Sequence, residues 1–161
     1  MKIVSFVAAS SNSGKTTLIE KVVRILKERG LRVAVIKHAS KGFAVDQPGK
    51  DSWRFREAGA DAVMLVGPDE MALMKNISRE PDLDDLAVMV QDIDVVLREG
   101  FKKDEGARIE VFRSGVSGDQ PLCMNDRSFR ALVSDVPFSV DIPRFDLNDA
   151  AAVADFIAAK L

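Results

Sequence analysis

Two patterns of apolar and polar residues recur along this chain, one typical of buried strands and one typical of an amphipathic helix. Residues 2–8, 31–38 and 92–100 hold apolar runs rich in β-branched side chains, typical of parallel strands covered on both faces. Between the first two runs, apolar residues recur every three or four positions from Thr16 to Arg29, which predicts an amphipathic helix ended by Gly30. A strand, a helix and a strand with short joins predict a βαβ unit.

Turn residues divide the rest of the chain into short elements. The middle of the chain is expected to form a surface loop at 39–50, a short helix capped by Asp51 or Ser52 and running through Ala58, and an antiparallel hairpin of 60–67 and 71–77 at or near a sheet edge. A helix within 81–91, with Pro81 in its first turn, is expected to follow. The last part should contain strands at 108–113 and 131–135, a poorly determined loop-like stretch at 113–130, and a closing helix over 147–161 capped by Asn148 or Asp149. Together they predict a mostly parallel, helix-covered sheet with antiparallel edge strands.

Length and composition narrow the class of protein. With 161 residues, 47% hydrophobic and 30% charged, the chain suits a single globular domain spanning 1–161. A net charge of −2 gives no electrostatic case for nucleic-acid or membrane binding, and no apolar run approaches the ~18 residues that cross a bilayer. The N-terminal stretch could be read as a signal peptide, but its apolar part is short and leads straight into a GKTT motif.

The single cysteine gives a further constraint. Cys123 cannot form an internal disulfide, and with His38 it supplies too few ligands for a zinc site. We therefore expect a reducing, cytoplasmic location.

The candidate chemistry begins at AASSNSGKTT, residues 8–17. It resembles the phosphate-binding loop (Walker A) pattern GxxxxGK[ST], except that Ala9 replaces the first glycine, and it lies between a strand and a helix as that loop requires. An alanine is tolerable there where its φ is negative. The expected fold is therefore α/β, a P-loop NTPase-like three-layer sandwich. The residues expected to bind nucleotide are Ser11, Asn12, Ser13, Gly14, Lys15, Thr16 and Thr17, with Thr16 also a magnesium ligand.

Acidic and basic residues elsewhere suit the same site. Glu99 stands at the carboxyl end of a buried strand and is the leading candidate for a Mg²⁺-binding carboxylate, the alternative being an ordinary loop acid. Asp46 lies in a polar, switch-like stretch and could bind Mg²⁺ through water or orient the attacking water. In the same stretch Lys50 and Arg56 could approach phosphate oxygens, although each could equally be a solvated surface residue.

The base and the catalytic cation are less well defined. Asp135, just beyond a short strand, could accept hydrogen bonds from guanine, but no NKxD motif is present. His38 is read as a structural or loop-contacting residue rather than a ligand. No arginine finger is evident beside the phosphate loop, so Arg56 or an arginine of a partner would have to serve.

With these residues assembled, the chain resembles the MobB family, the molybdopterin-guanine dinucleotide biosynthesis adaptor proteins. The resemblance covers most of the chain and rests on SNSGKTTL at 11–18, KH at 37–38, FAVDQPGKDS at 43–52 with Arg56 and AGA following, VVLREGFK at 95–102 and RIEVFR at 108–113.

The resemblance implies a dimeric GTP-binding protein with weak GTPase activity. It would use Mg²⁺ and assist the guanylyltransferase that attaches GMP to molybdopterin, with molybdopterin or its guanine dinucleotide as a further candidate partner. Lys15, Thr16, Asp46 and Glu99 match the family's nucleotide and magnesium positions, and Lys50, Asp51 and Arg56 match its polar loop. Ser40 and Lys41 stand where many members carry further histidines, so cofactor contact through those histidines is not expected here.

Two other readings remain open. A small P-loop kinase would need a lid with arginines, and residues 102–130 contain Arg108, Arg113, Arg127 and Arg130. A pure interaction domain with a decayed nucleotide site is the third reading. Equilibrium binding of labelled GTP and ATP with Mg²⁺ tests this third reading, since binding of neither would exclude both nucleotide-binding readings.

Overall fold

The computed structural model describes residues 1–101 and 106–161, so Lys102 of the VVLREGFK motif lies outside the described residues. Contacts group the chain into two compact units, one made of Met1–His38 and Val90–Leu161 and the other of Ala39–Met89. The expectation of a single domain stays a prediction. Within the described ranges, no helix has the length and apolarity needed to span a membrane.

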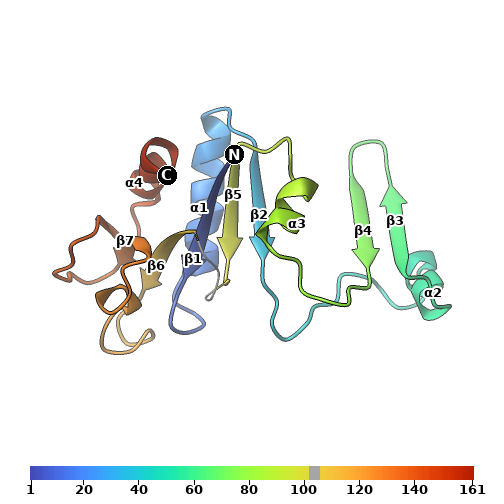
Figure 1. Cartoon of the computed structure of the whole chain (residues 1–161), viewed down its shortest axis with the longest axis horizontal. Helices are drawn as coiled ribbons and strands as arrows, with labels where there is room; N and C mark the ends of the chain where they lie inside the picture. The colour runs from blue at the N-terminus through green and yellow to red at the C-terminus, as the bar shows by residue number, and fades with distance from the viewer. Residues whose placement is uncertain (102–105) are drawn as a thin grey trace. The chain divides into compact units, whose positions relative to one another are not determined.

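A six-stranded sheet forms the centre of the first unit (Figure 1). Its strands are β1 (Lys2–Val7), β2 (Val33–Lys37), β5 (Val95–Glu99), β6 (Ala107–Phe112), β7 (Phe129–Ser134) and β8 (Arg144–Asp146). They lie in the order β2-β5-β1-β6-β7-β8, and every neighbouring pair is parallel. The predicted mostly parallel α/β sheet is confirmed, while β8 was not predicted.

Both faces of the inner strands β1, β5, β6 and β7 are largely buried, whereas the edge strands β2 and β8 are partly exposed. One face packs against α1 (Lys15–Glu28) and α4 (Ala150–Lys160), which share a core cluster with alternate strand residues such as Phe6 and Leu97. On the other face Glu110 is fully buried, and its carboxylate accepts hydrogen bonds from the backbone N–H groups of Leu122 and Cys123 at 2.7 and 2.8 Å. The 3-10 helix η1 (Leu122–Met124) is thereby fixed against the sheet.

The carboxyl ends of the central strands meet at one edge. Glu99 ends β5 and stands in register with Phe6 of β1 and Lys37 of β2. On the other side of β1, Val7 stands in register with Glu110 of β6. Because the strands are parallel, the loop from β1 to α1 emerges at this edge, where open α/β sheets bind ligands.

The N-caps of two helices can be compared with the predicted capping residues. Asp149 caps α4, and its carboxylate accepts a hydrogen bond from the backbone N–H of Ala152 at 3.0 Å. The predicted cap of α2 (Asp51–Glu57) is wrong, because Lys50 takes the cap position and makes no side-chain cap bond. The Ser52 hydroxyl donates instead to Asp46 Oδ1 at 2.9 Å.

In the second unit, β3 (Ala62–Val66) and β4 (Met71–Lys75) form the predicted antiparallel hairpin. Both are edge strands, as expected, but of a separate two-stranded sheet rather than of the six-stranded one. The hairpin could be predicted because its two strands are neighbours in the sequence and pair with each other. The residue pattern of a strand does not show which larger sheet, if any, the hairpin joins.

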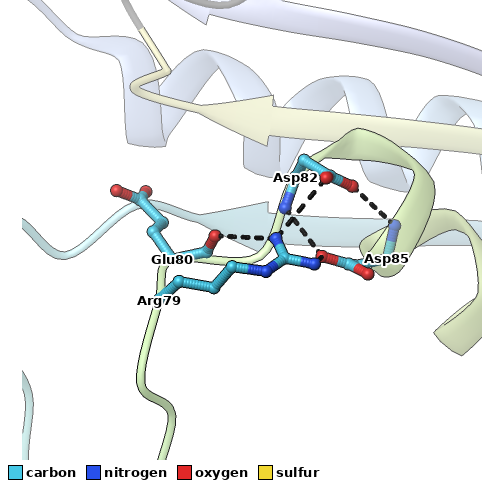
Figure 2. Close-up of polar contacts among 4 residues, drawn as sticks. All are labelled: Arg79, Glu80, Asp82 and Asp85. Atoms are coloured by element: carbon cyan, nitrogen blue, oxygen red, sulfur yellow. Dashed lines mark hydrogen bonds and ion pairs between the residues drawn. The ribbon is translucent and has the colours of Figure 1, made fainter.

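The predicted helix within 81–91 is α3 (Leu83–Met89), and a reciprocal cap begins it (Figure 2). The backbone N–H of Asp85 donates to Asp82 Oδ1 at 3.0 Å, and that of Asp82 donates to Asp85 Oδ2 at 3.2 Å. Arg79 pairs with both carboxylates. The backbone hydrogen bond from Asp85 is the largest cause of a lowered pKa at Asp82.

Candidate functional site

The loop from β1 to α1 contains two residues with a left-handed backbone conformation. Gly14 stands at the N-cap of α1 in the left-handed conformation, with φ of 92°, and Asn12 has φ of 63°. Asn12 and Phe101 are the described non-glycine residues with positive φ. Ala9 is not among them, so its methyl group meets no backbone strain of that kind, and the departure from the phosphate-loop pattern is conformationally tolerable.

Lys15, the first residue of α1, turns back over this loop. Its Nζ donates to the Ser10 carbonyl at 3.1 Å and to the Ser13 hydroxyl at 3.0 Å. Ser13 is fully buried. The ammonium group is thus held at a helix N-terminus, where the helix dipole and free N–H groups favour an anion.

Thr16 and Glu99 are brought together at the same edge of the sheet. The Thr16 hydroxyl lies 3.1 and 3.2 Å from the two carboxylate oxygens of Glu99. Lys37 Nζ lies 3.5 Å from Glu99 Oε1, and the Glu99 side chain is only 14% exposed. The expected position of Glu99 at the carboxyl end of a buried strand is confirmed, and its role as a magnesium ligand stays a prediction. The contact with Lys37 was not predicted.

These oxygens suit magnesium when phosphates complete the coordination. Mg²⁺ prefers hard oxygen ligands and commonly takes one or two from protein, with the remainder from phosphates and water. Outside residues 102–105, no group of three or more His, Cys, Asp or Glu side chains could hold a metal ion.

Sequence reasoning missed an arginine beside the loop. A Cβ built on Gly14 would lie 3.1 Å from Arg113 Nη2, so the guanidinium group stands directly over this glycine. Arg113 follows the last residue of β6, the neighbour of β1 in the sheet. The sequence shows no obvious arginine finger beside the loop, and the structure places the Arg113 guanidinium group there. The signal in the sequence was RIEVFR, a predicted strand whose end reaches the same edge of the sheet.

Asp135 is engaged by the segment that follows Arg113. Its Oδ1 accepts from the Ser114 N–H at 2.8 Å, and its Oδ2 accepts from the Ser114 hydroxyl at 3.1 Å. An ionised carboxylate has about four acceptor positions, so these two bonds leave capacity for a base. Reading of guanine by Asp135 stays a prediction.

His38 lies at the end of β2 and contacts the segment after β5. Its ring centroid lies 5.4 Å from that of Phe101, and a Cβ on Gly100 would lie 3.2 Å from the His38 Cβ. These contacts support its reading as a loop-contacting residue.

The remaining candidates belong to the second unit. Asp46 Oδ1 accepts from the Gln47 N–H and the Ser52 hydroxyl, both at 2.9 Å, while its buried Oδ2 has no hydrogen-bond partner among the described residues. Lys50 and Arg56 are exposed. The approach of these residues to the phosphate loop stays a prediction.

Arg108, one of the arginines considered for a kinase lid, has a structural setting. Its Nη2 lies 2.7 Å from Asp126 Oδ2, and its guanidinium carbon lies 4.6 Å from the Phe129 ring centroid. Asp126 is held chiefly by the Ser128 hydroxyl and backbone N–H, which lower its pKa. The Arg108 guanidinium is thus committed to bracing this segment.

Comparison with known proteins gives one consistent result. The profile of Molybdopterin guanine dinucleotide synthesis protein B (MobB) matches residues 3–135. The molybdopterin-guanine dinucleotide biosynthesis adapter proteins of Escherichia coli and Haemophilus influenzae are each 38% identical, covering 93% and 91% of this chain and 88% and 83% of their own. A crystal structure of molybdopterin-guanine biosynthesis protein B superposes with a TM-score of 0.77 at 32% identity, covering 99% of each chain. The family resemblance is confirmed, and the chain belongs to the MobB family.

Proposed function

We propose that this protein is a GTP-binding adaptor of molybdopterin guanine dinucleotide biosynthesis, with weak GTPase activity, that assists the guanylyltransferase attaching GMP to molybdopterin. The contact between Thr16 and Glu99 at the head of α1 carries the proposal. The relatives' description as adapter proteins of this biosynthesis supports the pathway.

Each residue of the loop has a role in nucleotide binding. Lys15 would exchange the Ser10 carbonyl and the Ser13 hydroxyl for phosphate oxygens, while backbone N–H groups of residues 11–16 surround the β-phosphate. Thr16 and Glu99 would hold Mg²⁺, which neutralises phosphate charge when bound. Hydrolysis would be slow, since no glutamine stands where a water-orienting side chain is expected in the sequence.

The polar loop of the second unit is proposed to respond to the nucleotide. Asp46 is proposed to hold a magnesium-bound water or to orient the attacking water. Its buried Oδ2 has no hydrogen-bond partner among the described residues, and such a water would satisfy it. Lys50 and Arg56 remain proposed phosphate contacts, and Asp135 the proposed reader of the guanine base.

A homodimer is proposed through the hairpin of the second unit. Met64 pairs with Leu73 and Val66 with Met71, and these four side chains on one face are 47–76% exposed. Two-stranded sheets are marginal alone, and an apolar face of this kind gains stability by burial against a second copy. Light scattering should give a dimer mass for the wild type and a monomer mass for Met64→Lys.

The adaptor is preferred over a small-molecule kinase. A kinase lid would draw on arginines after β5, but Arg108 is committed to Asp126 and Phe129. The lone Cys123 continues to favour a cytoplasmic location.

The experiment is reconstitution with purified guanylyltransferase, molybdopterin and limiting GTP. Wild-type protein should raise the yield of the guanine dinucleotide, and Lys15→Ala should not. Lys21→Ala, which removes an exposed lysine of the same helix, is the matched control. Equal yields with wild type and Lys15→Ala would contradict the proposal.

A further inference from the structure

Arg113, the residue that follows β6, places its guanidinium group beside the loop from β1 to α1. β6 pairs with β1, so Arg113, the residue after β6, emerges at the edge from which the loop leaves. Its Nη2 lies 3.1 Å from the position of a Cβ on Gly14. Gly14 is the N-cap of α1, next to Lys15. Two cationic side chains therefore converge on one helix N-terminus.

The backbone that carries Arg113 is braced. Its N–H donates to the Ser117 hydroxyl at 3.0 Å, and its carbonyl accepts from the N–H groups of Val116 and Ser117 at 3.2 and 2.9 Å. The Ser10 hydroxyl of the phosphate loop donates to the Val116 carbonyl at 2.8 Å. The turn that follows β6 is thus tied directly to the loop, which sets the side chain over Gly14.

The adjoining residue adds a second tie. Ser114 donates through its N–H and its hydroxyl to the two carboxylate oxygens of Asp135, at the end of β7. Arg113 itself is exposed and forms no ion pair with the residues that the structure describes. Its backbone is fixed, while its guanidinium group has donors to offer to an anion.

We infer that Arg113 binds phosphate oxygens of the nucleotide in the loop, acting from the protein's own chain rather than from a partner. This inference rests on the proposed function, since it needs a nucleotide at Lys15 and Thr16. A guanidinium group has five N–H donors in a planar fork that matches phosphate oxygens. Gly14 is required beneath it, because its φ of 92° strains other residues and a Cβ would crowd the guanidinium at 3.1 Å.

Two ordinary readings compete with this one. A surface arginine in solvent would affect nucleotide binding little, and an arginine that stacks on the base would act on guanine but not on phosphate. Inorganic tripolyphosphate separates them, because it has the phosphate chain without base or ribose.

The test compares wild type, Arg113→Ala and Arg113→Lys by competition against a labelled GTP analogue with Mg²⁺, using unlabelled GTP and tripolyphosphate as competitors. Arg113→Ala should weaken both competitors about tenfold, and Arg113→Lys should restore part of the loss. Arg144→Ala is the matched control, because Arg144 is an exposed arginine at the start of β8, and it should bind as wild type does. Equal unfolding midpoints in urea confirm that all variants fold.

Two results would overturn the inference while leaving the proposed function intact. In one, Arg113→Ala binds both competitors as the wild type does. In the other, GTP binding falls and tripolyphosphate binding does not, which assigns Arg113 to the base. A wild-type protein that binds no labelled GTP analogue would overturn the proposed function itself, and this inference with it.

Discussion

The hydroxyl of Thr16 donates to both carboxylate oxygens of Glu99, at 3.1 and 3.2 Å, across 83 positions of sequence. Thr16 lies in the first turn of α1, and Glu99 ends β5, the strand beside β1. The two oxygen ligands meet where a phosphate-bound magnesium ion would need them. The pair therefore links the parallel topology of the sheet directly to the proposed chemistry.

Glu99→Gln removes the charge and keeps the size of this side chain. Because the carboxylate would act on magnesium, hydrolysis of GTP should fall by about 10- to 100-fold while nucleotide affinity changes less. Single-turnover hydrolysis and equilibrium binding, both with Mg²⁺, measure the two effects. Glu20→Gln, an exposed residue of α1, serves as control. A hydrolysis rate unchanged by Glu99→Gln would show that Glu99 has another role.

The Cys123 thiol should be unreactive in the folded protein. Burial, followed by the neighbouring Glu110 carboxylate, raises its pKa to about 12. At ~pH 8 only about one thiol in ten thousand is then ionised, against about one in four at the ordinary pKa of ~8.5 in the urea-unfolded chain. Iodoacetamide should therefore react on the order of 1,000-fold more slowly with the native protein.

The same pKa gives a dependence of stability on pH. Since the folded value lies above the unfolded one, the neutral thiol contributes stability that is fully present below about pH 8.5 and declines as the pH rises toward 12. Cys123→Ser should flatten this part of the stability profile. Alkylation of native Cys123 as fast as in the unfolded chain would contradict the raised pKa of this thiol.

Removal of Glu110 should be costly. Its fully buried carboxylate accepts from the N–H groups of Leu122 and Cys123, and Glu110→Ala leaves both donors without that acceptor. We expect the free energy of unfolding to fall by about 2–4 kcal/mol in urea denaturation. Glu28→Ala, at an exposed position, should change it by less than about 0.5 kcal/mol. Similar losses for the two variants would contradict this role of Glu110.

Two neighbouring residues were equal candidates for the cap of α4, and the structure separates them. The Asp149 carboxylate accepts from the N–H of Ala152, so Asp149→Ala should lower the free energy of unfolding by about 1 kcal/mol. Asn148→Ala is the matched control and should have little effect. Thermal unfolding of the two variants measures the difference, and the opposite order would contradict the observed cap.

Much of the fold could be predicted from local pattern. The apolar runs and the helical spacing from Thr16 to Arg29 encode the βαβ unit directly. Glu99 could be placed beside the phosphate loop because parallel strands end at a common edge. β8 could not be predicted, since this strand has three residues and two of them are exposed.

The contacts missed at the site depend on the order of the strands. Arg113 reaches Gly14 because β6 adjoins β1, and Lys37 reaches Glu99 because β2 adjoins β5. The residue pattern of a single strand does not show which strands will be its neighbours in the sheet. The prediction of Ser52 as a cap failed because its hydroxyl donates a hydrogen bond to the nearby Asp46 carboxylate instead.

Equilibrium titration with labelled GTP and Mg²⁺, repeated with Lys15→Ala and with ATP as competitor, is the most direct measurement of whether this loop is a guanine-nucleotide site. We expect wild-type protein to bind GTP, Lys15→Ala to lose binding because the cation at the helix N-terminus is gone, and ATP to compete poorly. Binding of neither nucleotide by the wild type would contradict a nucleotide site at this loop. Equal competition by ATP and GTP would remove the guanine assignment.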